Sequence, residues 1–139
     1  MLYERWREVV GEFYTELAVC DFASKQNWTF GQLDALAVGG TEQRIVFPRG
    51  AAIDFILSVL TAWKSNAVVC PLEPDQPQPE IPPLPRHIAH VKITSATTGP
   101  ARLVALTAEQ LAADARNIVS TMGLKREWPN LAAISRAHS

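Results

Sequence analysis

The stretch at residues 43–70, QRIVFPRGAAIDFILSVLTAWKSNAVVC, decides the fold class of this chain. Residues 43–47 form a short apolar run with two β-branched side chains, which predicts a strand. A turn at 48–50 follows, and apolar residues at helical spacing over 51–64 predict an amphipathic helix. Residues 67–70 are a continuous apolar run typical of a buried parallel strand. Together these elements predict a right-handed βαβ unit and an α/β fold.

Two more helices are predicted before this unit. Residues 2–20 carry apolar side chains at helical spacing with charged ones between them, which predicts an amphipathic helix. We expect a loop at 21–27. Thr29 and Gln32 match a capping box, which predicts a short helix over 30–38.

A proline-rich segment follows the unit. Residues 71–86 hold seven of the ten prolines of the chain. Proline fixes φ and lacks the backbone N–H, so neither a helix nor a ladder strand is expected here. We predict an extended connector, and a docking site for a proline-reading domain is the alternative.

A hairpin and a further helix are predicted beyond the connector. Residues 88–93 alternate as a strand does, and the apolar residues 103–106 are expected to pair back against it. Thr107, with Gln110 three residues later, predicts the start of a helix over 108–122. The apolar residues expected to face inward from this helix are Leu111, Ala112, Ala115, Ile118, Val119 and Met122.

The composition is that of one globular domain. The 139 residues are 47% hydrophobic and 19% charged, and the net charge is -1 with both signs spread along the chain. This balance gives no indication of a nucleic-acid or anionic membrane partner. The longest mostly apolar run, residues 50–63, is too short to span a bilayer, and the first residues are too charged for a signal peptide. We therefore expect a cytoplasmic protein with Cys20 and Cys70 as reduced, buried thiols.

Candidate chemistry gathers in the segment ITSATTGPARLV at residues 93–104. Backbone N–H groups, hydroxyls, a glycine free to adopt positive φ and one fixed positive charge suit a bound phosphate. The alternative is a plain polar turn between two strands. The predicted phosphate-binding residues are Thr94, Ser95, Thr97, Thr98, Gly99 and Arg102.

Other site patterns are weaker or absent. His87 and His90 stand three residues apart with no Cys, Asp or Glu nearby in sequence, so no metal site is predicted. The sequence contains neither a Walker phosphate loop, nor a dinucleotide fingerprint, nor a nucleophile elbow.

Three segments resemble, in the right order, the AMP-forming adenylate-forming enzymes, which include acyl- and aryl-CoA synthetases. The loop at 94–103 is similar to that family's Thr-Ser-Gly-Ser/Thr-Thr-Gly-x-Pro-Lys-Gly loop, with Arg102 at the lysine position. WTFGQLD at 28–34 resembles an early Trp-Thr-Tyr-Gly-Glu-Leu-Asp segment, and AVVCPL at 67–72 resembles an Ala-Val-Val-x-Pro-Leu strand. The residues that depart from the loop pattern are Ala96, Ala101 and Leu103.

The resemblance implies a reaction and its reagents. A carboxylic acid attacks the α-phosphate of ATP with Mg²⁺ present, pyrophosphate leaves, and a thiol, usually that of coenzyme A, captures the acyl-adenylate. The residues at 94, 95, 97 and 98 would hydrogen-bond the β- and γ-phosphates, Gly99 would permit close backbone approach, and Arg102 would supply charge. Ala96, in place of the family's glycine, would cost about 1–2 kcal/mol if that position needs positive φ.

The resemblance covers only the first part of the family's catalytic unit. A last strand is predicted at 131–135, and the family's later motifs, including its catalytic lysine domain, do not occur in these 139 residues. We therefore expect residues 1–139 to be an incomplete N-terminal subdomain of an AMP-binding domain, a partial three-layer sheet with flanking helices. Such a piece is expected to self-associate through its cut sheet. Two functions stay open: the N-terminal portion of an ATP-dependent acid–thiol ligase, or an inactive α/β module that keeps the fold, so enzyme activity is uncertain.

Overall fold

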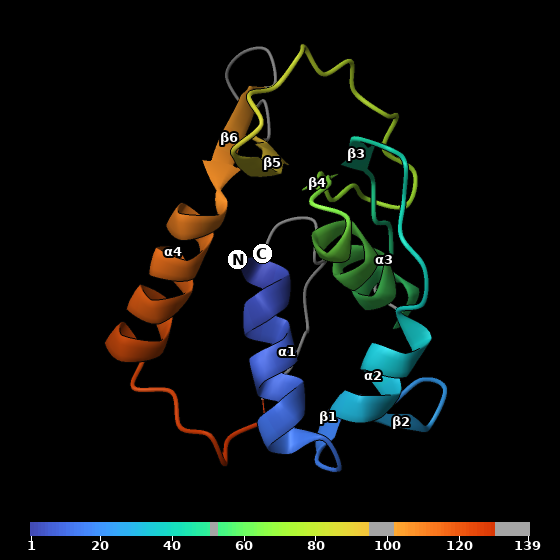
Figure 1. Ribbon diagram of the computed structural model, residues 1–139, viewed down its shortest axis with the longest axis vertical. Helices are drawn as coiled ribbons and strands as arrows, with labels where there is room; N and C mark the ends of the chain where they lie inside the picture. Colours follow the sequence, from blue (N-terminus) through green and yellow to red (C-terminus); the bar gives the residue numbers. More distant parts are fainter. Residues whose placement is uncertain (51–52, 95–101, 130–139) are drawn as a thin grey trace.

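The structure is a computed structural model that describes residues 1–50, 53–94 and 102–129. The helices are α1 (Leu2–Phe13), α2 (Phe30–Leu36), α3 (Ile53–Lys64) and α4 (Ala108–Thr121) within these ranges. The strands of the same ranges are β1 (Leu17–Asp21), β2 (Gln26–Thr29), β3 (Ile45–Val46), β4 (Val68–Val69), β5 (Ile88–Ile93) and β6 (Leu103–Thr107). Figure 1 shows their arrangement.

The βαβ unit predicted from residues 43–70 is confirmed. Strands β3 and β4 pair in parallel, with Ile45 opposite Val68, and α3 connects them. The sheet continues in the order β3-β4-β5-β6, with β5 parallel to β4 and β6 antiparallel to β5. Residues 88–93 and 103–107 thus form the predicted hairpin, and the α/β class is correct.

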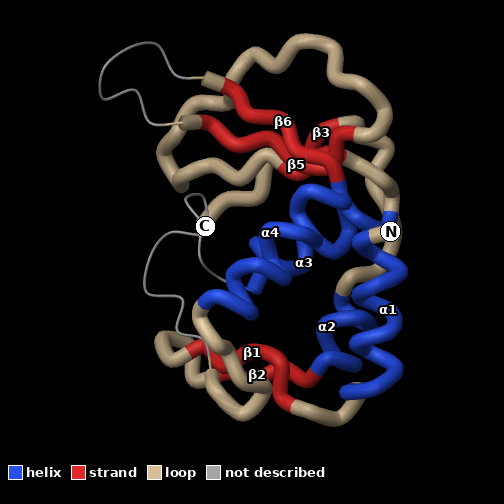
Figure 2. Tube along the Cα trace, turned by 90° about the vertical axis from the view of Figure 1, so that its left-hand side faces the viewer, coloured by secondary structure: helices blue, strands red, loops and turns tan. Residues whose placement is uncertain are grey.

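The two faces of this sheet are covered differently. On one face α3 packs its buried Ala62 against Ala67 and Val69. On the other face Ile81 and Leu84 of the connector pack against a buried cluster that contains Val68, Cys70, Leu72, Ile88 and Val91. Figure 2 shows the sheet, the helices and the β1–β2 hairpin as successive layers.

The connector between β4 and β5 contains no helix or strand, as predicted, although Leu72 forms an isolated parallel bridge with Arg49. Two arginines of the β3 region bind its backbone. The Arg49 guanidinium donates to the carbonyls of Glu73, Pro74 and Gln76, and the Arg44 guanidinium donates to the carbonyl of Pro85 at 3.0 Å. The connector is therefore a covering layer of the sheet.

The helix predicted over 2–20 is wrong beyond Phe13. Residues 17–21 form β1, which pairs antiparallel with β2 and places Val19 opposite Trp28. Cross-strand pairing, with Val19 and Trp28 packed against the helical core, outweighs the helical spacing of these residues. The turn that replaces the predicted loop at 21–27 is only residues 22–25, and Asp21 accepts hydrogen bonds there from the backbone N–H groups of residues 23 and 24.

Both capping boxes are confirmed. Thr29 starts α2 and accepts from the Gln32 N–H at 3.2 Å, and Thr107 starts α4 and accepts from the Gln110 N–H at 3.1 Å. Helix α2 ends two residues earlier than predicted, whereas α4 ends close to Gly123, which has φ +59°.

Two burial predictions are wrong. Cys20 is exposed because β1 turns it to solvent, whereas Cys70 is buried as expected, and burial raises the pKa of its thiol. Helix α4 has no buried residue, and Ile118, Val119 and Met122 are 45%, 50% and 65% exposed. The strand predicted at 131–135 lies outside the described residues.

Candidate functional site

The candidate phosphate segment joins β5 to β6 at one edge of the sheet. The parallel strands β3, β4 and β5 end at this edge with Val46, Val69 and Ile93. In open α/β sheets ligands bind outside the carboxyl ends of the parallel strands. The hairpin therefore carries Thr94 and Arg102 to the edge where this architecture usually binds its ligand.

Thr94 and Arg102 are brought together by the hairpin. The Thr94 N–H donates to the Arg102 carbonyl at 2.9 Å. The Thr94 hydroxyl accepts from the Arg102 N–H at 3.2 Å and lies 3.4 Å from the Arg102 carbonyl, to which it donates. These contacts pair two of the six predicted site residues, and in this conformation the Thr94 hydroxyl holds the hairpin together.

The other four predicted residues, Ser95, Thr97, Thr98 and Gly99, lie outside the described residues. So do Ala96 and Ala101, two of the three departures from the family pattern. Their roles in phosphate binding stay predictions. The third departure, Leu103, is the first residue of β6, pairs with Ile93 and is 38% exposed.

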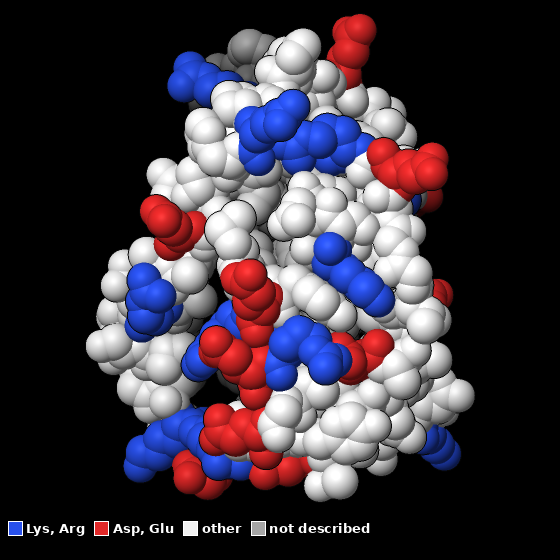
Figure 3. All heavy atoms as spheres, viewed as in Figure 1, with Lys and Arg blue, Asp and Glu red and all other residues white. Residues whose placement is uncertain are grey.

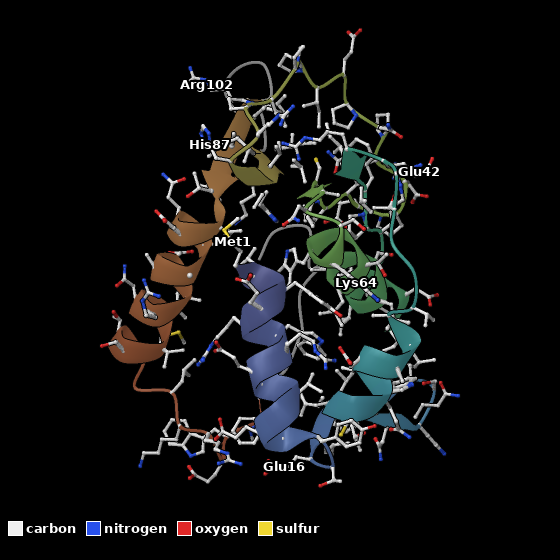
Figure 4. All side chains as sticks on the ribbon, viewed as in Figure 1. Met1, Glu16, Glu42, Lys64, His87 and Arg102 are labelled. Carbon is white, nitrogen blue, oxygen red and sulfur yellow. The ribbon has the colours of Figure 1, made fainter. Side chains whose placement is uncertain are left out.

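The Arg102 side chain is free to meet an anion. It is exposed and makes no hydrogen bond or ion pair with any other described residue. Figure 4 shows it at the outer end of β6, away from the helices. Basic side chains gather on the same upper part of the molecule, over the four-stranded sheet, in the view of Figure 3.

Lys92 is a second cation beside the segment, and the sequence analysis did not predict it as a site residue. Side chains alternate along a strand, so Lys92 shares a face of β5 with His90 and Thr94, opposite the buried Val91. Its position two residues before Thr94, at the period of a strand, was the available signal. The chain therefore places one cation on β5 and another directly before β6.

His90 lies on the same face and stays neutral near pH 7. Burial, and secondarily the charge of Lys92, lowers the pKa of His90 to about 4. His87 is exposed at the start of β5. No three His, Cys, Asp or Glu side chains among residues 1–50, 53–94 and 102–129 stand together as a metal site requires.

No model of a protein family matches this chain, and no curated protein matches it in sequence. In the described part of the chain, each helix is too short or too polar to cross a membrane. Function is therefore proposed from the residues and their geometry.

Proposed function

We propose that this chain is the N-terminal portion of an ATP-dependent, AMP-forming acid–thiol ligase, and that its own part in the reaction is to hold the terminal phosphates of ATP at residues 94–102. The observation that carries the proposal is the closed base of this segment. The Thr94–Arg102 contacts lie at the carboxyl edge of three parallel strands, and beside them stands a guanidinium that pairs with no other described residue.

The chemistry of the reaction explains why such a segment is useful. When a carboxylate oxygen attacks the α-phosphorus, the bond to the β-phosphate oxygen breaks and negative charge grows on the departing pyrophosphate. Hydrogen-bond donors that are already fixed in place stabilise this charge without reorganising during the step. Arg102 adds a bidentate donor with permanent charge, and Lys92 adds a compact ammonium.

The described residues suit some reagents of the proposed reaction better than others. The guanidinium of Arg102 and the ammonium of Lys92 suit the phosphates of ATP, while the Thr94 hydroxyl bonds to the backbone of Arg102 and positions it. Within residues 1–50, 53–94 and 102–129 no cluster of carboxylates suits a protein-held Mg²⁺, so we derive no step from a metal on this chain. Coenzyme A and the acid enter only through the resemblance, and no described residue is assigned to them.

Calorimetric titration tests the proposal. ATP and tripolyphosphate should bind to the chain, and adenosine should not. Arg102→Gln should weaken both phosphate ligands about fivefold, since an exposed charge contact contributes about 1 kcal/mol. Arg86→Gln is the matched control, because Arg86 is also exposed but lies just before the start of β5, at the end of this strand away from the segment. Binding of adenosine as tight as that of ATP, or equal effects of the two substitutions, would contradict it.

A further inference from the structure

A large apolar cavity lies between α1 and α4, away from the candidate phosphate segment. Its volume is about 920 Å³. Trp6 and Val9 of α1, Phe55 and Trp63 of α3, and Leu111 and Ala115 of α4 form its walls. Figure 3 shows the surface hollowed between α4 and α1, and Figure 1 shows the two helices standing apart. We call this cavity the α1–α4 groove.

The apolar lining continues beyond the groove along α4. Ile118, Val119 and Met122 follow Leu111 and Ala115 at helical spacing, and they are 45%, 50% and 65% exposed. A stripe of this kind over about three turns of helix needs a long apolar partner. A compact small molecule in the groove would leave the second half of the α4 stripe, Ile118, Val119 and Met122, exposed to solvent.

The charged groups at the groove are all basic. Arg5 and Arg116 line it, and no Asp or Glu is among its described lining residues. Arg5 donates to Glu8 at 2.6 Å, whereas Arg116 makes no ion pair with any described residue. His90 also lines the groove and is neutral near pH 7, with Lys92 as the charged neighbour on its own strand. An occupant with acidic edges would therefore meet an unpaired guanidinium.

The dimensions suit a helix. An α-helix is about 10–12 Å wide with its side chains and rises about 1.5 Å per residue, which is roughly 120–170 Å³ per residue. The groove therefore holds about two turns, and α1 and α4, with 12 and 14 residues, are long enough to flank a third helix on both sides.

We propose that the α1–α4 groove binds an amphipathic helix of a partner polypeptide, with apolar residues at i, i+3, i+4 and i+7 and acidic residues along its edges. The partner helix packs its apolar face on Trp6, Leu111 and Ala115, continues along the α4 stripe, and pairs an edge carboxylate with Arg116. Helices α1, α2 and α3 are held to one another in the core through Trp6, Leu33 and Leu60, so none of them is available to enter the groove of another molecule. A second copy could offer only α4, which is itself a wall of the groove. This function is independent of the phosphate segment.

Two synthetic 18-residue helical peptides with the same leucine face test the proposal. One carries glutamates along its edges and the other lysines. In fluorescence anisotropy with the intact chain, the acidic peptide should bind at least tenfold more tightly, and high salt should reduce the difference. A benzophenone placed on its apolar face should cross-link to residues of α1 and α4 in the unsubstituted chain.

Variants locate the contact. Ala112→Trp, which fills the groove, should abolish binding, and Arg116→Glu should reverse the preference toward the basic peptide. Lys64→Glu, exposed at the end of α3, is the control and should change nothing. Equal affinity for both peptides, cross-links outside α1 and α4, or a dimer of the chain that excludes the acidic peptide from the groove would each overturn the proposal.

Discussion

At the scale of single residues, Thr94 and Arg102 limit each other's roles. The Thr94 hydroxyl bonds to the backbone of Arg102, which leaves the Arg102 side chain as the exposed cation. Thr94 therefore contributes to a phosphate site chiefly by fixing the position of the Arg102 backbone, from which the guanidinium extends. Lys92, on the neighbouring strand, extends the positive charge along the same hairpin.

His90 gives the residue scale its pH dependence. Its pKa is lowered from the ordinary 6.5 to about 4, so the unfolded chain binds more protons than the folded one between these values. The contribution of His90 to the free energy of unfolding should therefore be complete above about pH 6.5. It should be lost as the pH drops toward 4, which lowers the free energy of unfolding by at most about 3 kcal/mol.

Urea titrations at several pH values measure this loss. His90→Gln cannot titrate, so the difference between the wild type and this variant isolates the contribution of His90 from that of the acidic side chains. Parallel curves for the two proteins between pH 4 and 6.5 would show that His90 is not the cause.

At the scale of elements, the two capping boxes should respond differently to the same substitution. Helix α2 packs its buried Leu33 and Gly31 in the molecule, whereas α4 buries no residue. Thr29→Ala should lower the free energy of global unfolding by about 1 kcal/mol. Thr107→Ala should instead make α4 fray, because a helix with no fully buried residue depends more on its cap.

Amide hydrogen exchange together with urea unfolding separates these outcomes. Thr107→Ala should accelerate exchange in α4 while barely moving the urea midpoint, and Thr121→Ala at the other end of α4 is the matched control. A full loss of about 1 kcal/mol of global stability in Thr107→Ala would mean that α4 is part of the cooperative core.

The elements also show what the sequence could predict. The caps at Thr29 and Thr107 and the apolar run at 67–70 depend on local chemistry, and all three predictions are confirmed. Residues 17–21 carry a helical pattern, but their conformation is set by pairing with 26–29, a contact that spacing does not encode. The prediction that α4 turns its apolar residues inward was wrong for a similar reason. An amphipathic pattern predicts that the apolar face of a helix packs on a partner, but not that the partner belongs to the same chain.

At the scale of the whole molecule, the four-stranded sheet lies between the connector on one face and helices on the other. The role of the connector as a layer was not predictable, because its Ile81 and Leu84 show no periodicity among the prolines. Of the candidate site, the sequence named Thr94 and Arg102 as phosphate-binding residues but did not predict that they pair, since that contact depends on the register of β5 and β6. Lys92 was not predicted, although it lies two residues before Thr94 on the same strand.

Catalysis is a property of the whole assembly of motifs, so the 139 residues alone should not form an acyl-adenylate. The measurement is ATP–pyrophosphate exchange with a panel of carboxylic acids. We expect exchange at background for every acid, since the proposed function gives these residues phosphate contacts only and assigns none of them to the acid. Exchange above background that depends on an added acid would contradict this expectation.

The central claim, that residues 94–102 bind phosphate, is tested most directly by mapping backbone amide shifts while pyrophosphate is added to the ¹⁵N-labelled chain. The account predicts saturable shifts concentrated between Lys92 and Val104, which become weaker in Arg102→Gln and stay the same in Arg86→Gln. Shifts spread over other elements, or no shifts at millimolar pyrophosphate, would contradict it.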